Sequence, residues 1–158
     1  MNIDGSSPVN LTNNPGVDSY PDWSPDGSMI AFRRGDGGSS EIYVMNVDGS
    51  NQARLTSNLS VDHQPTWSPD GTKIAFVSDR AGAYEIYVMN GDGTNQTRLA
   101  PNGNADEEPS WSPDGSKIVF DSHRDAALRE IYVMNADGLN LTRLTNNSSQ
   151  DRFADWGP

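Results

Sequence analysis

Short apolar segments, separated by polar turns that contain glycine, run along the whole chain. In the segments "KIAFVS" (73–78) and "EIYVMN" (85–90), branched and aromatic residues fill most positions, which is typical of β-strands. In the second segment Ile86 and Val88 fall on one face, whereas Tyr87 and Met89 fall on the other. Both faces are apolar, so we expect this strand to be buried on both sides.

The same elements recur with a period of 44 or 45 residues. "WSPDG" stands at 23–27, 67–71 and 111–115, and "EIYVMN" begins at 41, 85 and 130. Each unit predicts four strands: one that ends at the tryptophan, one after the turn "SPDG", the "EIYVMN" strand, and one after an "N-x-D-G" turn. Both turns are tight, so neighbouring strands should be antiparallel.

A period of 40–45 residues with four strands per unit is typical of a β-propeller blade. The competing architecture is a solenoid of β-arches, which requires parallel strands. We therefore predict an all-β propeller of four-stranded antiparallel blades. Three complete blades are expected at about 20–57, 64–100 and 108–145. Partial blades are expected at 1–19 and 151–158, with single strands near Val9–Thr12 and Phe153–Trp156.

The consensus "DxxPxWSPDGxxIAF…EIYVMNxDG…LT" resembles the WD40-like PD40 repeat of TolB-type propellers, and the resemblance covers essentially all 158 residues. The consensus lacks the Trp-Asp dipeptide of true WD40 blades. The resemblance implies a propeller that engages partner proteins of the cell envelope, in the periplasm or another extracytoplasmic space. Related propellers occur in tricorn and prolyl oligopeptidase-like peptidases, where a separate hydrolase domain carries the chemistry.

Composition narrows the classes of function. The formal net charge of −11 disfavours nucleic acid and anionic lipid as partners. The chain has no cysteine, so thiol catalysis and zinc–thiolate sites are excluded. No apolar run reaches membrane-spanning length, and the N-terminus has no signal-peptide pattern, which leaves the compartment open. No catalytic motif such as G-x-S-x-G is present, so we predict that the chain is not an enzyme.

An aspartate precedes each repeated tryptophan by five residues. If the first strand of each blade is innermost, these carboxylates lie near one mouth of the central channel. There they could bind a cation such as calcium or the basic groups of a partner, with neighbouring glutamates contributing. The alternative is that each aspartate caps its own loop. The residues concerned are Asp18, Asp62, Asp106, Asp151, Glu107 and Glu108.

Other repeated residues have structural interpretations. The tryptophans are expected to pack between adjacent blades rather than to stack on a ligand. Arg80 and Arg124 hold equivalent positions and are expected to pair with the aspartates of a neighbouring blade, whereas the first unit has Asp36 there. His63 and His123 are expected to lie on the surface or in loops. The tryptophans are Trp23, Trp67, Trp111 and Trp156.

The loops form two sets. The "SPDG" and "N-x-D-G" turns hardly vary, whereas the loops into the first strand and those between the second and third strands differ in every unit. Binding residues concentrate on variable loops of a rigid scaffold. We therefore assign the variable face and the channel mouth to a protein partner, one with basic groups because the surface is acidic.

Two further expectations concern assembly and function. Three blades and two loose strands do not close a ring, so the chain is either a piece of a longer propeller or a subunit whose copies associate. We expect association, with a dimer favoured. Besides a protein-interaction scaffold, three alternatives stay open. They are a propeller that binds a small ligand or cation through the aspartates, a detached propeller of a hydrolase, and a fragment without an evolved ligand.

Overall fold

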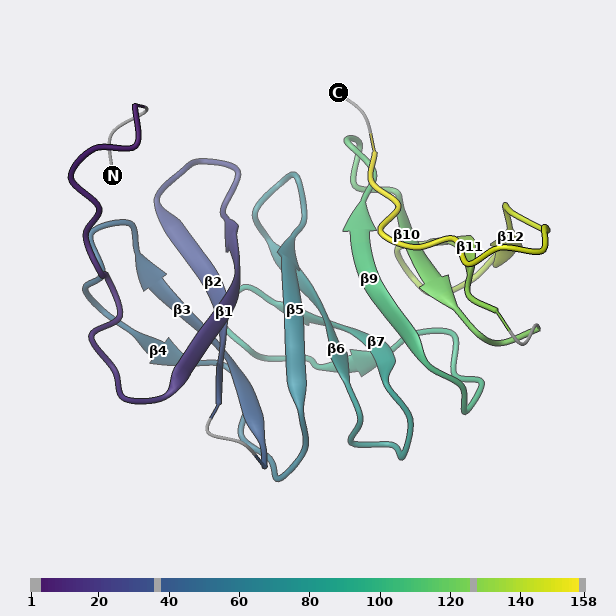
Figure 1. Cartoon of the computed structure of the whole chain (residues 1–158), viewed down its shortest axis with the longest axis horizontal. Coiled ribbons are helices and arrows are strands. Elements are labelled where there is room, and N and C mark those ends of the chain that lie inside the picture. The colour runs from purple at the N-terminus through teal and green to yellow at the C-terminus, as the bar shows by residue number, and fades with distance from the viewer. Residues whose placement is uncertain (1–3, 36–37, 126–127, 157–158) are drawn as a thin grey trace.

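The computed structural model describes residues 4–35, 38–125 and 128–156 and contains three four-stranded antiparallel sheets (Figure 1). The first sheet contains β1 (Val17–Trp23), β2 (Met29–Gly35), β3 (Ser40–Asn46) and β4 (Ala53–Arg54). The middle sheet contains β5 (Asp62–Trp67), β6 (Lys73–Ser78), β7 (Glu85–Asn90) and β8 (Thr97–Arg98). The third sheet contains β9 (Asp106–Trp111), β10 (Lys117–Ser122), β11 (Glu130–Asn135) and β12 (Thr142–Arg143). The predicted fold class is confirmed.

The turn "SPDG" sets the register of each sheet's first hairpin. In the middle sheet the N–H of Gly71 donates to the carbonyl of Ser68 at 2.9 Å, and Gly71 has φ +69°. Glycine accepts this left-handed conformation without the penalty that a Cβ would bring. The hairpin then aligns Trp67 with Ile74, as the equivalent turns align Trp23 with Ile30 and Trp111 with Ile118.

The core contains three apolar clusters, and two of them form layers on the two sides of the middle sheet. Tyr87 and Met89 face the first sheet, whereas Ile86 and Val88 face the third. The prediction that this strand is buried on both faces is therefore confirmed. Such burial explains why the strand is apolar at consecutive positions.

The sheets form an open arc. Strands β1, β5 and β9 lie side by side in the centre of Figure 1, whereas β4 and β12 lie far from the centre, on the left and on the right. The first and third sheets lie at the two ends of the arc. No helix occurs in the described residues, and so none there is long and apolar enough to cross a membrane.

The described segments at the two ends of the chain contain no strand, so the single strands expected near Val9–Thr12 and Phe153–Trp156 are not formed. Each segment nevertheless makes contacts that the expected strand would make. Gln52 donates to the carbonyl of Leu11 at 3.2 Å, as Gln96 donates to the carbonyl of Leu55 at 3.2 Å. Leu11 therefore takes the place on the first sheet that Leu55 takes on the middle one.

Candidate functional site

The first strand of each sheet, β1, β5 or β9, is called the inner strand here. Each inner strand contains a bulge at the same position. The register with the next strand shifts there, and the bulged residue is left-handed: Tyr20, Gln64 and Glu108 have φ of 52°, 53° and 56°. This conformation is unfavourable for a residue with a Cβ. In proteins generally, such strained backbone is concentrated at functional sites. The bulges line a shallow pocket together with the prolines that follow them, Pro21, Pro65 and Pro109.

Beside the bulges lies a pocket of about 200 Å³, which we call the mouth groove; it is lined by Tyr20, Arg33, Val61, His63, Tyr84 and Glu107. The ring of His63 meets the ring of Tyr84 edge-on, with centroids 5.0 Å apart, and lies 6.0 Å from the ring of Tyr20. Burial, helped by the positive charge of Arg33, lowers the pKa of His63 to about 4. His63 is therefore a neutral ring at pH 7 and is buried, contrary to the expected surface position.

Five of the six residues that line the mouth groove are not repeated between the units, whereas Val61 is matched by Val17. The positions equivalent to His63 hold Ser19 and Glu107, and those equivalent to Tyr84 hold Ser40 and Arg129. Likewise, Arg33 is replaced by Val77 and Asp121 in the other units. Three sheets of the same architecture therefore carry different chemistry at these positions, so blade structure does not dictate these residues.

The repeated aspartates are bound within their own sheets. Asp62 accepts from Arg80 at 2.9 Å and from Asn58 at 2.7 Å. In the third sheet Asp106 accepts from Arg124 at 2.6 Å. The expectation that Arg80 and Arg124 would pair with a neighbouring blade is wrong, because each reaches across one hairpin to the start of its own inner strand.

The first sheet makes the same ion pair with a different arginine. Arg34 donates to Asp18 at 2.7 and 3.0 Å, and its guanidinium lies 5.1 Å from the ring centroid of Phe32 and 4.9 Å from that of Tyr43. Arg80 lies over the equivalent rings of the middle sheet. Arg34 stands two positions before the equivalent of Arg80, so alignment of the repeats did not reveal it. Asp36, which occupies that equivalent position, lies outside the described residues.

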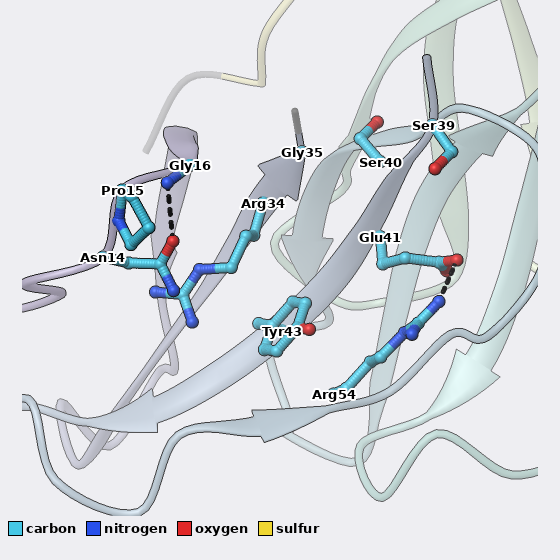
Figure 2. Close-up of a pocket in the computed structure, with 10 residues that line it drawn as sticks. All are labelled: Asn14, Pro15, Gly16, Arg34, Gly35, Ser39, Ser40, Glu41, Tyr43 and Arg54. Carbon is cyan, nitrogen blue, oxygen red and sulfur yellow. Dashed lines mark hydrogen bonds and ion pairs between the residues drawn. The ribbon is translucent and has the colours of Figure 1, made fainter. Parts of the chain in front are cut away.

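Figure 2 shows a pocket of about 470 Å³ beside Arg34 and Tyr43. Its two guanidinium groups are already paired, Arg34 with Asp18 and Arg54 with Glu41. Paired charges leave little electrostatic attraction for an added ion. We therefore do not place the functional site here.

The four aspartates considered as a cation site do not form a shared cluster. Asp151 accepts from Asn147 at 2.5 Å, in the way that Asp62 and Asp106 accept from their own loops. Within the described residues, no three histidine, aspartate or glutamate side chains lie together in a way that would hold a metal ion. Three of these carboxylates accept from the side-chain amides of loop asparagines, whereas the loop-capping alternative expected backbone N–H donors.

The two neighbouring glutamates have different surroundings. Glu107 is paired with Arg129 and forms a wall of the mouth groove. Glu108 accepts from the side-chain amide of Gln64 at 2.6 Å and donates its N–H to that amide at 3.1 Å. Burial raises the pKa of Glu108. Only Glu107 is therefore part of the groove, and Glu108 joins two inner strands.

Of the four repeated tryptophans, Trp67 and Trp111 lie at the contacts between sheets. Trp67 and Trp111 are buried in the two apolar layers, and the indole N–H of Trp111 donates to the carbonyl of Thr66 at 3.2 Å. Trp156 donates in the same way to Ser110 at 3.3 Å. Trp23, on the outer side of the first sheet, is 54% exposed.

Sequence analysis missed a second repeated ion pair. The glutamate of each "EIYVMN" strand is buried and pairs with an arginine of the last strand of its sheet. Both residues recur with the period of the repeat, and this shared period was the available signal. The pairs are Glu41–Arg54, Glu85–Arg98 and Glu130–Arg143.

The family model for the TolB β-propeller domain, PD40, matches residues 1–126. The putative TolB of Agrobacterium tumefaciens is 30% identical with a TM-score of 0.74, over 84% of this chain and 50% of that one. TolB of Acinetobacter baumannii is 25% identical with a TM-score of 0.77, over 90% of this chain and 36% of that one. The chain thus spans half of the first structure and about a third of the second.

Structures with other functions share only the fold. A puromycin-hydrolysing peptidase of Mycobacterium tuberculosis is 18% identical with a TM-score of 0.77, over 94% of this chain and 25% of that one. At this identity the likeness extends to architecture and not to activity. No curated protein sequence matches the chain.

Proposed function

The chain belongs to the TolB β-propeller family, and on this premise we propose that it is a non-enzymatic scaffold that binds a protein partner at the mouth groove. The proposal includes an extracytoplasmic location, which rests on the resemblance to TolB alone. Fold does not determine function, so the argument depends on the groove itself.

One observation carries this proposal: side chains that differ between the units gather in the mouth groove, although the strands that hold them repeat. Tyr20 comes from β1, His63 from β5 and Glu107 from β9, while Tyr84 precedes β7. A repeat that served packing alone would keep the same side chains at these positions. Divergence at one location favours selection for a ligand.

The groove favours an extended peptide with an aromatic or aliphatic side chain next to a basic one. Its rings offer an apolar surface with polar edges, which is typical of protein-binding sites. The net charge of −11 attracts cationic segments over a longer range, whereas Glu107 is already paired with Arg129 and adds little attraction of its own. Arg33, which also lines the groove, disfavours a ligand that is basic throughout.

The test is selection of peptides from a displayed random library on the immobilised chain, followed by titration calorimetry with the enriched sequences. We expect enriched peptides to combine an aromatic or aliphatic residue with Lys or Arg. Their affinity should fall at least tenfold in Tyr84→Ala, and it should weaken with salt.

Leu139→Ala provides the matched control, because Leu139 is exposed in an "N-x-D-G" turn on the opposite face. Each variant is first shown by thermal melting to be folded. Enriched peptides that bind Tyr84→Ala as well as the parent chain would contradict the assignment of the groove. So would a selection that enriches nothing.

A further inference from the structure

Neighbouring inner strands lie side by side. The outer edge of β1, on the side away from β5, has no such neighbour among the described residues. β5 contacts β1, and β9 contacts β5. Residues 151–156 continue this series beside β9, where the indole of Trp156 donates to Ser110 and the Ser110 hydroxyl donates to Asp155 at 2.6 Å. Within the described residues, no inner segment lies on the other side of β1. There Trp23 is 54% exposed, against 8% for Trp67 and 7% for Trp111.

We propose that this edge of β1 binds residues 151–156 of a second copy of the chain. In this pairing the segment follows β9 of its own chain and is followed by β1 of the other chain. It thus has an inner strand on each side, as β5 has β1 and β9. Equivalence points to this occupant, since residues 151–156 already hold the position of an inner strand and no described strand lies on their other side.

A hydrogen bond inside the chain shows how the contact would be made. The carboxylate of Asp22 accepts the backbone N–H of Trp67 on the next sheet at 2.6 Å. Asp155 stands before Trp156 as Asp22 stands before Trp23. Only one oxygen of Asp155 accepts from Ser110, so the other can accept the N–H of Trp23 from the second copy.

The bulge residues provide a second contact. Phe153 is left-handed at φ 58°, like Tyr20 at 52°, and the two side chains are 66% and 47% exposed. At the equivalent positions of adjacent strands, Gln64 and Glu108 lie within hydrogen-bonding distance. Phe153 of one copy would therefore meet Tyr20 of the other, and burying two aromatic rings favours association.

The contact joins opposite ends of the arc and is therefore head-to-tail. Each copy offers one β1 edge and one 151–156 segment, so two copies can satisfy both contacts in a closed ring. This assembly shares Tyr20 with the mouth groove and would extend the row of inner strands that holds the groove.

The experiment uses the absence of native cysteine. Tyr20→Cys and Phe153→Cys are prepared as separate chains, mixed, and treated with a short bifunctional maleimide. We expect cross-linked dimers in the mixture and little product from either variant alone. Light scattering over a dilution series should show a discrete oligomer for the parent chain and at least a tenfold weaker association for Asp155→Ala.

Leu59→Cys mixed with Phe153→Cys is the control, because Leu59 is 94% exposed in a loop away from this edge. A parent chain that stays monomeric at every concentration would overturn the proposal. Cross-linking of Tyr20→Cys with itself as strong as in the mixture would also overturn it, because it indicates a symmetric contact. Folding of each variant is checked by its melting curve.

Discussion

The first and middle sheets have the same strand order and the same repeated motifs but different surroundings. Trp67 and Trp23 hold the same register in their sheets, yet Trp67 is enclosed between two sheets and Trp23 faces solvent. Phe32, in contrast, is as buried as Phe76, because Leu11 packs over its face of the sheet. A repeated residue therefore owes its burial to the neighbouring unit and not to its own. The comparison yields four predictions.

The largest expected difference is between two identical truncations. Trp67→Ala should lower the free energy of unfolding by about 3–5 kcal/mol, because it empties a site in the apolar layer. Trp23→Ala should lower it by about 1 kcal/mol or less, because the ring is largely exposed. Urea denaturation of dilute samples measures both. Equal losses would show that Trp23 is covered in solution.

The ion pairs give a second contrast, between the third and first sheets. Arg124→Ala should destabilise by about 3 kcal/mol, since it leaves Asp106 buried without its cation. Arg34→Ala should cost about 1 kcal/mol, because Asp18 is partly hydrated. Adding Asp106→Asn to the Arg124→Ala chain should restore part of the stability. Without such recovery, the loss would come from packing.

A third prediction concerns close contact between sheets. A Cβ on Gly93 would lie 2.9 Å from the carbonyl oxygen of Leu55 on the first sheet, whereas one on Gly71 would meet Pro25 at an ordinary 3.7 Å. Both glycines have positive φ, so each alanine variant costs about 1 kcal/mol. Gly93→Ala should cost about 1 kcal/mol more, as measured by urea denaturation. Equal costs would mean that the two sheets separate easily.

The smallest effect expected is a pH dependence with opposite signs at neighbouring residues. Hydrogen bonds from Ser24 and Ser28 lower the pKa of Asp26 to about 2, so its stabilisation is complete above pH 4 and is lost as pH falls toward 2. Burial between the first two sheets raises the pKa of Asp22, so its protonated form is favoured, and its contribution to stability decreases as pH rises through that raised pKa. NMR titration of the two carboxyls tests the signs. An unshifted pKa at Asp22 would show that the first two sheets leave it hydrated, and a lowered one would show that its hydrogen bonds outweigh burial.

Much of the fold was predictable because the repeat isolates what every blade requires. Apolar residues on both faces of "EIYVMN" predicted burial on both sides, and the tight turns predicted antiparallel hairpins. The strands at the two ends were not formed, because a strand needs a neighbour to bond with. Alignment of the repeats gave the residue pattern of these segments, but it did not give the strands with which they would have to pair.

The site was less predictable, because its geometry depends on backbone detail. The left-handed bulge at Tyr20, Gln64 and Glu108 has no sequence signal that we identified beyond the proline after it. Arg34 replaces Arg80 from a different position, since a long flexible side chain can reach the same carboxylate from two places along a strand. Alignment compares positions, whereas ion pairs depend on where the charged ends arrive.

The location of the hydrogen bonds has a consequence for how such a chain can evolve. Asp62 and Arg80 belong to one unit, and several bonds between units end on a backbone carbonyl, which every residue provides. A duplicated gene segment of one period would therefore encode a blade that brings its own ion pair and fits beside its neighbours without matching substitutions. Recombination could add or remove whole blades, while the few unmatched residues of the inner strands diverge separately.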